Sequence, residues 1–330
     1  MEVWSDDARA RRFYLGEYGH HRSDGDVPYQ ALVKLRFNCK SAGKLSNLVP
    51  RRHKWLASWQ YQVEFSQNQI EIEARGNYFA IPMVHHMLVH HALRYLAACN
   101  GLMMLHAGGV SRAGRSILFS GKGGMGKTTT TAILLSDTET GWQVHADDYV
   151  FLSSQPKSLA YMTRQHIYLP LLRWVPRLRY VMTFWERLGL FVFGNLRRWS
   201  QEGLKWPVRL EPQRAWPQNE LCFSADPTGL VLLRREDLPH ARLNPVLDTN
   251  TAVDELIEMN FSESRYFIDL VSAVQPDFDQ QLKEWQGLER GLLEKVVAAV
   301  PMFELVLPKT PSDFLTAQKE ITTLLLTILE

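Results

Sequence analysis

The residues most able to do chemistry begin with the stretch SGKGGMGKTTTT, residues 120–131. Residues 121–128 satisfy the pattern G-x(4)-G-K-[ST], in which glycines let backbone N–H groups converge on phosphate oxygens. The helix expected from Lys127 onward points its positive end at the same anion. We expect Lys127 to reach the β- and γ-phosphates of ATP and the Thr128 hydroxyl to bind Mg²⁺. The residues expected to hold the nucleotide are Gly121, Lys122, Gly123, Gly124, Met125, Gly126, Lys127, Thr128 and Thr129.

A histidine and two carboxylates flank this loop along the chain. His106 lies in LMMLHAGGV, fifteen residues before Gly121, and Asp147 and Asp148 lie in WQVHADDYVFL, about twenty residues after Lys127. Neighbouring side chains at the end of a strand point to opposite faces, so one carboxylate can serve a metal while the other faces an acceptor hydroxyl. Two carboxylates beside a polyphosphate would titrate as a coupled pair. His106 could hold one carboxylate or contact the γ-phosphate; a buried histidine satisfied by one hydrogen bond is the structural alternative.

An α/β core is needed to position these residues. LMMLHAGGV, RSILFSG and WQVHADDYVFL are typical of strands, and KTTTTAILLSD after the second is typical of a helix, which gives the strand–loop–helix–strand order of a nucleotide-binding fold. Residues 83–99 have helical spacing and end at a glycine stop. Further strands are expected in ELCFSA and LVLLRR, joined by a turn at DPTG, and in MFELVL. Further helices are expected in AVDELIEMNF, in LERGLLEKVVAAV and from Pro311 onward.

Composition limits the class of protein. At 330 residues the chain can hold two domains, and its net charge of +2 argues against a nucleic-acid partner. Three scattered cysteines, Cys39, Cys99 and Cys222, are typical of reduced thiols rather than a disulfide framework. The charged start MEVWSDDARARR lacks the apolar core of a signal peptide, and no apolar run is long enough to span a bilayer. These features predict a cytoplasmic protein.

The pieces LHA, GxxxxGKT and GWQVHADD, spaced over residues 102–152, resemble the C-terminal domain of HPr kinase/phosphorylase and its small-molecule and peptide-modifying relatives. That group shares a core with the ATP-dependent phosphoenolpyruvate carboxykinases. The resemblance implies a P-loop kinase core of this type and transfer of the γ-phosphoryl group from ATP, with Mg²⁺, to a hydroxyl. It assigns Asp148 as the base, and Asp147 either to the Mg²⁺ shell or to the orientation of His106. It also places a catalytic arginine where this chain has Arg209 and Arg214, of which we choose Arg214; a solvated arginine is the alternative.

The chain departs from that family in two respects. The family's second signature, with a Glu and an Arg on a glycine-rich turn, has no counterpart, and the N-terminal part differs from the family's own N-terminal domain. We therefore expect a small-molecule hydroxyl acceptor other than HPr, with a serine in a protein or peptide as the second choice. The predicted organisation is a β-rich N-terminal module at residues 1–82 and a P-loop kinase domain at 83–330.

Lys122 supports a different interpretation of the same loop. KGGMGKTT also resembles the deviant Walker A motif of the partition and septum-positioning ATPases, in which the extra lysine reaches the partner's nucleotide in a dimer. Those proteins place the loop near the N-terminus, and they carry a later Asp on an apolar strand. Here about 100 residues precede the loop, and the only later candidate, RYFIDLVSAVQPD, could equally be a helix. A switch ATPase is thus the alternative to a kinase.

Residues 161–210 form an expected insert that is basic, aromatic and helical. It could close over the acceptor as a lid, and its arginines suggest an anionic acceptor, while its aromatic residues could stack a sugar or base or lie on a membrane surface. A solvated amphipathic subdomain is the structural alternative, and a nucleic-acid end kinase is disfavoured by the near-neutral charge. The basic residues are Arg173, Arg177, Arg179, Arg187, Arg197 and Arg198. The aromatic residues are Trp174, Tyr180, Phe184, Trp185, Phe191 and Phe193.

Two further features leave alternatives open. His86 and His90 in VHHMLVHH are spaced as a metal pair on one helix face, but no third ligand is evident, which favours ordinary helix-surface or interface histidines. Self-association into a homo-oligomer is compatible with the sequence, which does not determine it.

Overall fold

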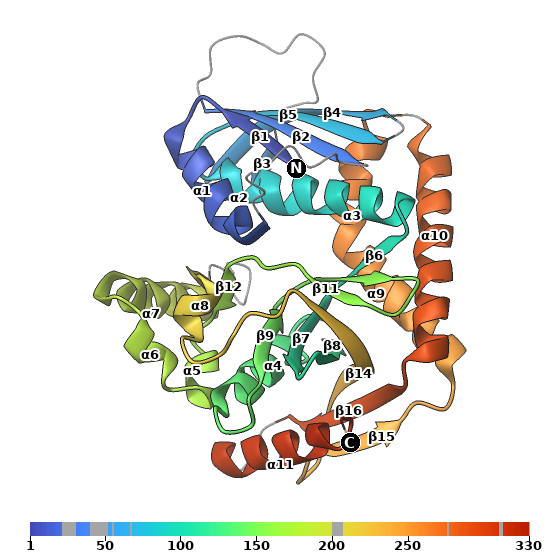
Figure 1. Ribbon diagram of the computed structural model, residues 1–330. Coiled ribbons are helices and arrows are strands. Elements are labelled where there is room, and N and C mark those ends of the chain that lie inside the picture. The colour runs from blue at the N-terminus through green and yellow to red at the C-terminus, as the bar shows by residue number, and fades with distance from the viewer. Residues whose placement is uncertain are drawn as a thin grey trace. The chain divides into compact units, whose positions relative to one another are not determined.

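The computed structural model describes residues 1–21, 31–39, 52–54, 56–66, 68–199, 207–275, 277–309 and 313–329. The chain is a mixed α/β protein with several mixed sheets, which confirms the predicted α/β class (Figure 1). It divides into two compact units, one of residues 1–104 and 257–294 and the other of residues 105–256 and 295–330. This division differs from the predicted boundary at residue 82, because the helices after it pack against the strands of the first unit.

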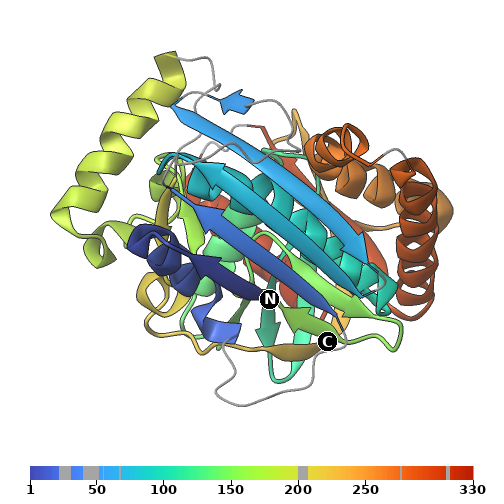
Figure 2. The same cartoon turned by 90° about the horizontal axis from the view of Figure 1, so that it is seen from above.

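The first unit contains a five-stranded sheet in the order β1-β2-β5-β4-β3. Its strands are β1 (Glu2–Ser5), β2 (Leu32–Asn38), β3 (Arg52–Lys54), β4 (Ala57–Ser66) and β5 (Gln69–Gly76). Its helical elements are α1 (Ala8–Tyr18), the 3-10 turn η1 (Gly19–His21), α2 (Ala80–Val84), the π-helical turn η2 (His85–Val89), α3 (His90–Cys99), part of α9 (Thr249–Ser272) and most of α10 (Phe278–Ala299). The sheet buries every second residue of β5, including Ile70 and Ile72, and α3 runs along one face of it (Figure 2).

The π-helical turn changes which histidines meet. The wider turn brings residues five apart onto one face, so the Nε2 atoms of His85 and His90 lie 2.9 Å apart. The predicted pair of His86 and His90 has ring centroids 6.1 Å apart instead. In the described part of the chain, none of these three histidines belongs to a set of three metal-ligating groups.

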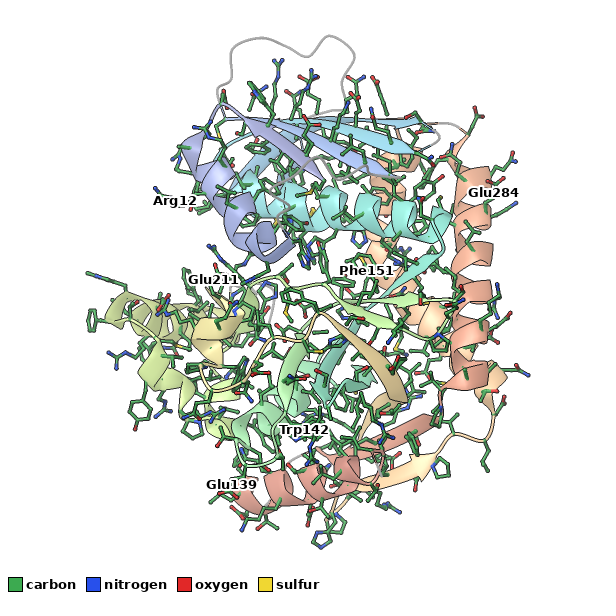
Figure 3. All side chains as sticks on the ribbon, viewed as in Figure 1. Arg12, Glu139, Trp142, Phe151, Glu211 and Glu284 are labelled. Atoms are coloured by element: carbon green, nitrogen blue, oxygen red, sulfur yellow. The ribbon has the colours of Figure 1, made fainter. Side chains whose placement is uncertain are left out.

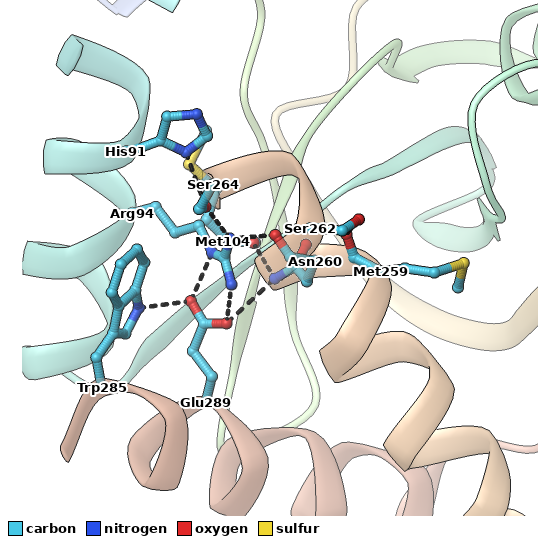
Figure 4. A network of polar contacts seen from close by, with 9 residues as sticks. All are labelled: His91, Arg94, Met104, Met259, Asn260, Ser262, Ser264, Trp285 and Glu289. Carbon is cyan, nitrogen blue, oxygen red and sulfur yellow. Dashed lines mark hydrogen bonds and ion pairs between the residues drawn. The ribbon is translucent and has the colours of Figure 1, made fainter. Parts of the chain in front are cut away.

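A buried ion pair ties the helices of the first unit together (Figure 4). Arg94 on α3 and Glu289 on α10 are almost fully buried, and Arg94 Nε donates to Glu289 Oε1 at 2.7 Å while Nη2 pairs with Oε2. Asn260 on α9 donates to Glu289 Oε2 at 3.1 Å and gives its own carbonyl to Arg94. Trp285 Nε1 donates to Glu289 Oε1 at 2.8 Å. Each guanidinium nitrogen of Arg94 and each carboxylate oxygen of Glu289 thus has a hydrogen-bond partner, which such a pair requires to be stable.

The second unit is a mixed sheet whose strands run in the order β10-β11-β14-β8-β7-β9, with β16 also beside β14 and β15 beside β16. Its strands are β7 (Ala107–Arg112), β8 (Arg115–Ser120), β9 (Gln143–Ala146), β10 (Val150–Ser153), β11 (Ser158–Ala160), β14 (Ser224–Glu236), β15 (Arg242–Pro245) and β16 (Met302–Pro308), and β6 (Leu102–Leu105) leads into it. Helix α4 (Lys127–Ser136) lies against β7 and β8, and α11 (Phe314–Leu326) packs on α4. The core beneath α4 includes Trp142, while Glu139 lies exposed (Figure 3).

The predicted turn at DPTG is wrong. ELCFSA and LVLLRR do not form two strands joined by a turn, because Ser224–Glu236 is one continuous strand, β14. The register of β14 against β8 shifts between Pro227 and Gly229, so the proline and glycine make a bulge within the strand.

The insert between the aspartate pair and β14 contains a short two-stranded sheet and several helices. Strand β12 (Gln165–Ile167) pairs antiparallel with β13 (Val208–Leu210). The helices are α5 (Leu171–Trp174), α6 (Leu178–Val181), α7 (Phe184–Trp199) and α8 (Pro212–Ala215). The side chains of Arg197 and Arg198, which the sequence places in the basic set, lie outside the described residues. No helix of the described ranges combines the length and apolar character needed to cross a membrane.

Candidate functional site

The phosphate-binding motif forms the connection between β8 and α4. Gly124 and Gly126 have φ values of +86° and +117°, in the region that favours glycine, and Gly126 is the N-cap of α4. A Cβ on Gly121 would lie 3.1 Å from the carbonyl oxygen of Leu233 on the neighbouring strand β14. The side chain of buried Lys127 folds back across the loop, and its Nζ donates to the Gly121 carbonyl at 2.5 Å. Local backbone geometry therefore favours glycine at these positions, in addition to the phosphate binding proposed for the loop.

The sheet topology brings the other predicted residues to the same edge. Strand β7 lies between β8 and β9 and runs antiparallel to both, with Ala107 opposite Ser120 and Gly109 opposite Ala146. The start of β7 therefore meets the ends of β8 and β9. His106 directly precedes the start of β7, the loop from residue 121 follows β8, and the pair at 147–148 follows β9. The structure therefore brings all of them to the same edge of the sheet.

Gly108 is the reason that α4 can lie so close to this edge. A Cβ at Gly108 would be 2.8 Å from Thr131 Oγ1 on α4 and 3.1 Å from the carbonyl oxygen of Asp147. The sequence places Gly108 within an expected strand, and its role follows only from the structure. The signal was the glycine itself within an apolar strand, which often marks a close approach of another backbone.

Asp147 and Asp148 have different partners and different proton affinities. Burial, and then the charge of Asp148, raises the pKa of Asp147 to about 7. The nearby Thr128 side chain opposes that rise. Burial also acts to raise the pKa of Asp148, but the hydrogen bond and charge of His166, with the nearby charges of His106 and Lys127, hold it below its usual range. The pair therefore combines a carboxyl that retains a proton easily with one that is ionised at neutral pH.

His166 is the principal site residue that the sequence did not predict. Its Nδ1 lies 2.8 Å from Asp148 Oδ2, and its backbone N–H donates to Asp147 Oδ2 at 3.2 Å. Burial acts to lower the pKa of His166, but the hydrogen bond to Asp148 and the charges of Asp148 and Asp147 together raise it. His166 belongs to the expected insert and contacts the aspartates from β12, which pairs with β13.

Arg209 and Arg214 differ in where the structure places them. Arg209 lies opposite His166 in the β12–β13 ladder, where opposing side chains share a face, and its charge acts on His166. The Arg214 guanidinium instead forms an ion pair with Glu186, at 2.7 Å to Oε1 and 2.5 Å to Oε2, and donates to the Val181 carbonyl. Arg209 thus lies beside the site residue His166, whereas Arg214 is held in an ion pair at the start of α7. The catalytic role of Arg214 stays a prediction.

Arg235 contacts the phosphate loop from the end of β14. Its Nε donates to the Met125 carbonyl at 3.2 Å, and its Nη2 lies 3.3 Å from the position of a Cβ on Gly126. Burial lowers the pKa of Arg235. Arg235 directly follows Arg234 in the sequence, and nothing in this pair indicates which of the two arginines faces the loop. In the structure Arg234 pairs with Glu255 and Glu304 instead.

The remaining predicted residues have simpler surroundings. The His106 ring centroid lies 4.9 Å from that of Tyr149, and the His106 carbonyl accepts a hydrogen bond from Ser120 Oγ at 3.1 Å. Lys122 is exposed at the rim of the loop, as are Gly123 and Gly124.

The donor atoms of the site determine whether it fits Mg²⁺. One ligand atom each from Asp147, Asp148 and His166 lies within 4.8 Å of the others, and Thr128 adjoins Asp147. Mg²⁺ prefers carboxylate and hydroxyl oxygen, so Asp147, Thr128 and Asp148 fit it, while His166 is already bonded to Asp148.

Neither the protein-family models nor the curated proteins with which the chain was compared gave a match. The functional assignment therefore depends on the residues of the chain and on the geometry that joins them.

Proposed function

We propose that this protein is an ATP- and Mg²⁺-dependent kinase that transfers the γ-phosphoryl group to a hydroxyl of a small molecule, within a P-loop kinase core. The observation that supports it most is the meeting of a complete phosphate-binding motif with two carboxylates at one sheet edge, where Thr128 adjoins Asp147. Phosphoryl transfer mainly requires alignment and charge neutralisation, and these groups are suited to both.

Each residue would have a distinct part in this reaction. The ammonium of Lys127, which bonds the Gly121 carbonyl, would turn to the β- and γ-phosphates when ATP binds. Asp147 and Thr128 would hold Mg²⁺, which neutralises charge on the phosphates. Asp148, ionised at neutral pH and oriented by His166, would align the acceptor hydroxyl and receive its proton. Arg209, on the same face as His166, is better situated than Arg214 to neutralise charge on the transferred group.

The alternative of a switch ATPase finds less support in the same residues. That class needs a later Asp on a strand, but the candidate segment RYFIDLVS forms part of α9. A small molecule with a hydroxyl group, anionic or sugar-like, is our first choice of acceptor, and Arg209 opposite His166 supports an anionic one. A serine side chain in a protein or peptide would need the same chemistry.

The test follows the label of γ-labelled ATP with Mg²⁺ in three mixtures: the protein alone, with a metabolite extract and with a protein extract. We expect label in a new small molecule, reduced at least about 100-fold by Asp148→Asn, the range for loss of a positioned base. Glu139→Gln is the matched control, because it removes an exposed carboxylate of the same unit. Asp148→Asn should still bind a fluorescent ATP analogue, whereas Lys127→Ala should not.

Three results would contradict the proposal in different ways. Label in a protein band would transfer the assignment to a protein kinase. Label released only as inorganic phosphate, together with ATP-dependent dimerisation that Lys122→Ala abolishes, would favour the switch ATPase. Equal transfer by Asp148→Asn and the unmodified protein would remove Asp148 from the mechanism.

A further inference from the structure

Helices α6 and α7 present an unusual concentration of apolar surface, most of it on α7. Of the eighteen large apolar side chains that the described residues expose, seven lie between residues 180 and 196. They are Tyr180, Phe184, Trp185, Leu188, Phe191, Val192 and Leu196. Tyr180 is 88% exposed and Trp185 76%. Single exposed apolar residues are normal on a protein surface, but a contiguous group of this kind marks an interaction site.

The exposed residues share one side of the helix. Phe184, Leu188, Phe191 and Val192 are spaced i, i+4, i+7 and i+8, and Trp185 and Leu196 widen the same side. At 100° per residue the six cover about 140° of the circumference. The opposite side carries Leu190, which is buried. This is an amphipathic helix whose apolar face is turned to solvent.

The inner side of α7 is fixed to the rest of the unit. Thr183 and Glu186 form a capping box, with the Thr183 N–H donating to Glu186 Oε2 at 2.7 Å and the Glu186 N–H to Thr183 Oγ1 at 3.3 Å. Arg214 then holds Glu186 from α8. Further along, Gly194 packs so closely on Leu169 that a Cβ would lie 2.7 Å from it. Because these contacts define the rotation of the helix, the apolar face is held outward.

The charge around this face selects among occupants. Residues 161–199 contain seven arginines and one acid, Glu186, which Arg214 already engages. Arg173, Arg179 and Arg187 are exposed. A two-fold contact between copies of this chain would oppose the face to itself and bring these positive charges together. An anionic lipid surface instead complements the arginines and accepts the aromatic side chains at its headgroup level.

We propose that α7 is a membrane-surface helix that places its Phe184–Leu196 apolar face into the interface of an anionic bilayer. The helix lies in the plane of the interface, with Trp185 and Phe191 among the acyl-chain boundary and the exposed arginines at the phosphates. This inference is independent of the kinase proposal, because it concerns binding alone.

The test is co-sedimentation of the full chain with vesicles of phosphatidylcholine alone or with 30% phosphatidylglycerol. We expect at least about 25-fold stronger binding to the anionic vesicles, weakened by 0.5 M NaCl. The variant Phe184→Ser/Trp185→Ser/Phe191→Ser should abolish binding, and Arg179→Gln/Arg187→Gln should weaken it roughly 25-fold, at about fivefold per charge near the surface. Leu247→Ser/Leu315→Ser is the matched control, because it removes two exposed leucines of the same unit.

A second readout locates the contact. Brominated lipids should quench part of the tryptophan fluorescence of the protein, and Trp185→Phe should remove that part. Equal binding to neutral and anionic vesicles, binding unaffected by the triple variant, or no binding at all would each overturn the proposal. So would a concentration-dependent dimer that the triple variant converts to a monomer, because the face would then belong to a second copy.

Discussion

Gly108→Ala is a severe test of how the site is assembled. The added Cβ would meet Thr131 Oγ1 at 2.8 Å and the Asp147 carbonyl oxygen at 3.1 Å. The first contact can be relieved by rotation of the threonine side chain, since its hydroxyl has no hydrogen-bond partner among the described residues. The second contact is with backbone, so the chain at Asp147 must move by a few tenths of an ångström.

The expected cost follows from these two contacts. Adding a methyl group to a close-packed position destabilises by about 1–3 kcal/mol, and we expect the lower half of that range because one contact can relax. The shift at Asp147 should also weaken Mg²⁺-dependent binding of an ATP analogue. Thr131→Ala made together with Gly108→Ala should recover part of the stability but none of the binding, because it relieves only the first contact.

Chemical denaturation and titration with a fluorescent ATP analogue measure both effects. Gly291→Ala is the control, since a Cβ there would meet nothing within 4 Å and alanine suits a helix better than glycine. If Gly108→Ala were as stable as the unmodified protein and bound the analogue equally well, the close approach of α4 and Asp147 to β7 would be refuted.

Three other perturbations test separate parts of the structure. Glu289→Gln leaves Arg94 buried without its counter-charge, so denaturation should show a loss of about 3–5 kcal/mol, and a loss below 1 kcal/mol would contradict the buried pair. Burial lowers the pKa of His145, so the unfolded chain takes up its proton first; stability should fall as the pH drops below 6.5, and denaturation of His145→Gln at pH 7.5 and 5.5 should show less of that fall. Arg235→Ala removes a donor to the Met125 carbonyl and should weaken ATP-analogue binding about tenfold in a titration, whereas unchanged affinity would exclude Arg235 from the loop's function.

The parts of the site that could be predicted depend on local chemistry. The motif at residues 121–128 consists of residue types that suit a glycine-rich loop and a helix start, which is why the loop between β8 and α4 could be predicted. His106 and the aspartates were also within reach, because each directly adjoins an apolar strand and strand ends collect at sheet edges. The general α/β class followed from the same alternation of strands and helices.

The parts that could not be predicted depend on contacts between distant segments. His166 contacts Asp148 from residues 165–167, which pair with residues 208–210 across the whole insert, and no periodicity within either segment indicates that pairing. The residues around the bulge at Pro227 have the composition of a turn. Their pairing with the neighbouring strand keeps them within one strand. The ion pair of Arg94 and Glu289 joins residues 195 positions apart.

The insert unites two roles that its sequence presents separately. Its two ends are β12 and β13, which contribute His166 and Arg209 to the aspartate pair, and its middle is α7, whose outward face is apolar. Arg214 follows β13 directly and binds Glu186 at the start of α7. The arginine that the resemblance suggested for catalysis therefore connects the strand pair of the site to the base of the exposed helix. The strand pair beside the aspartates and the exposed helix thus belong to one insert, and the ion pair between Arg214 and Glu186 joins them.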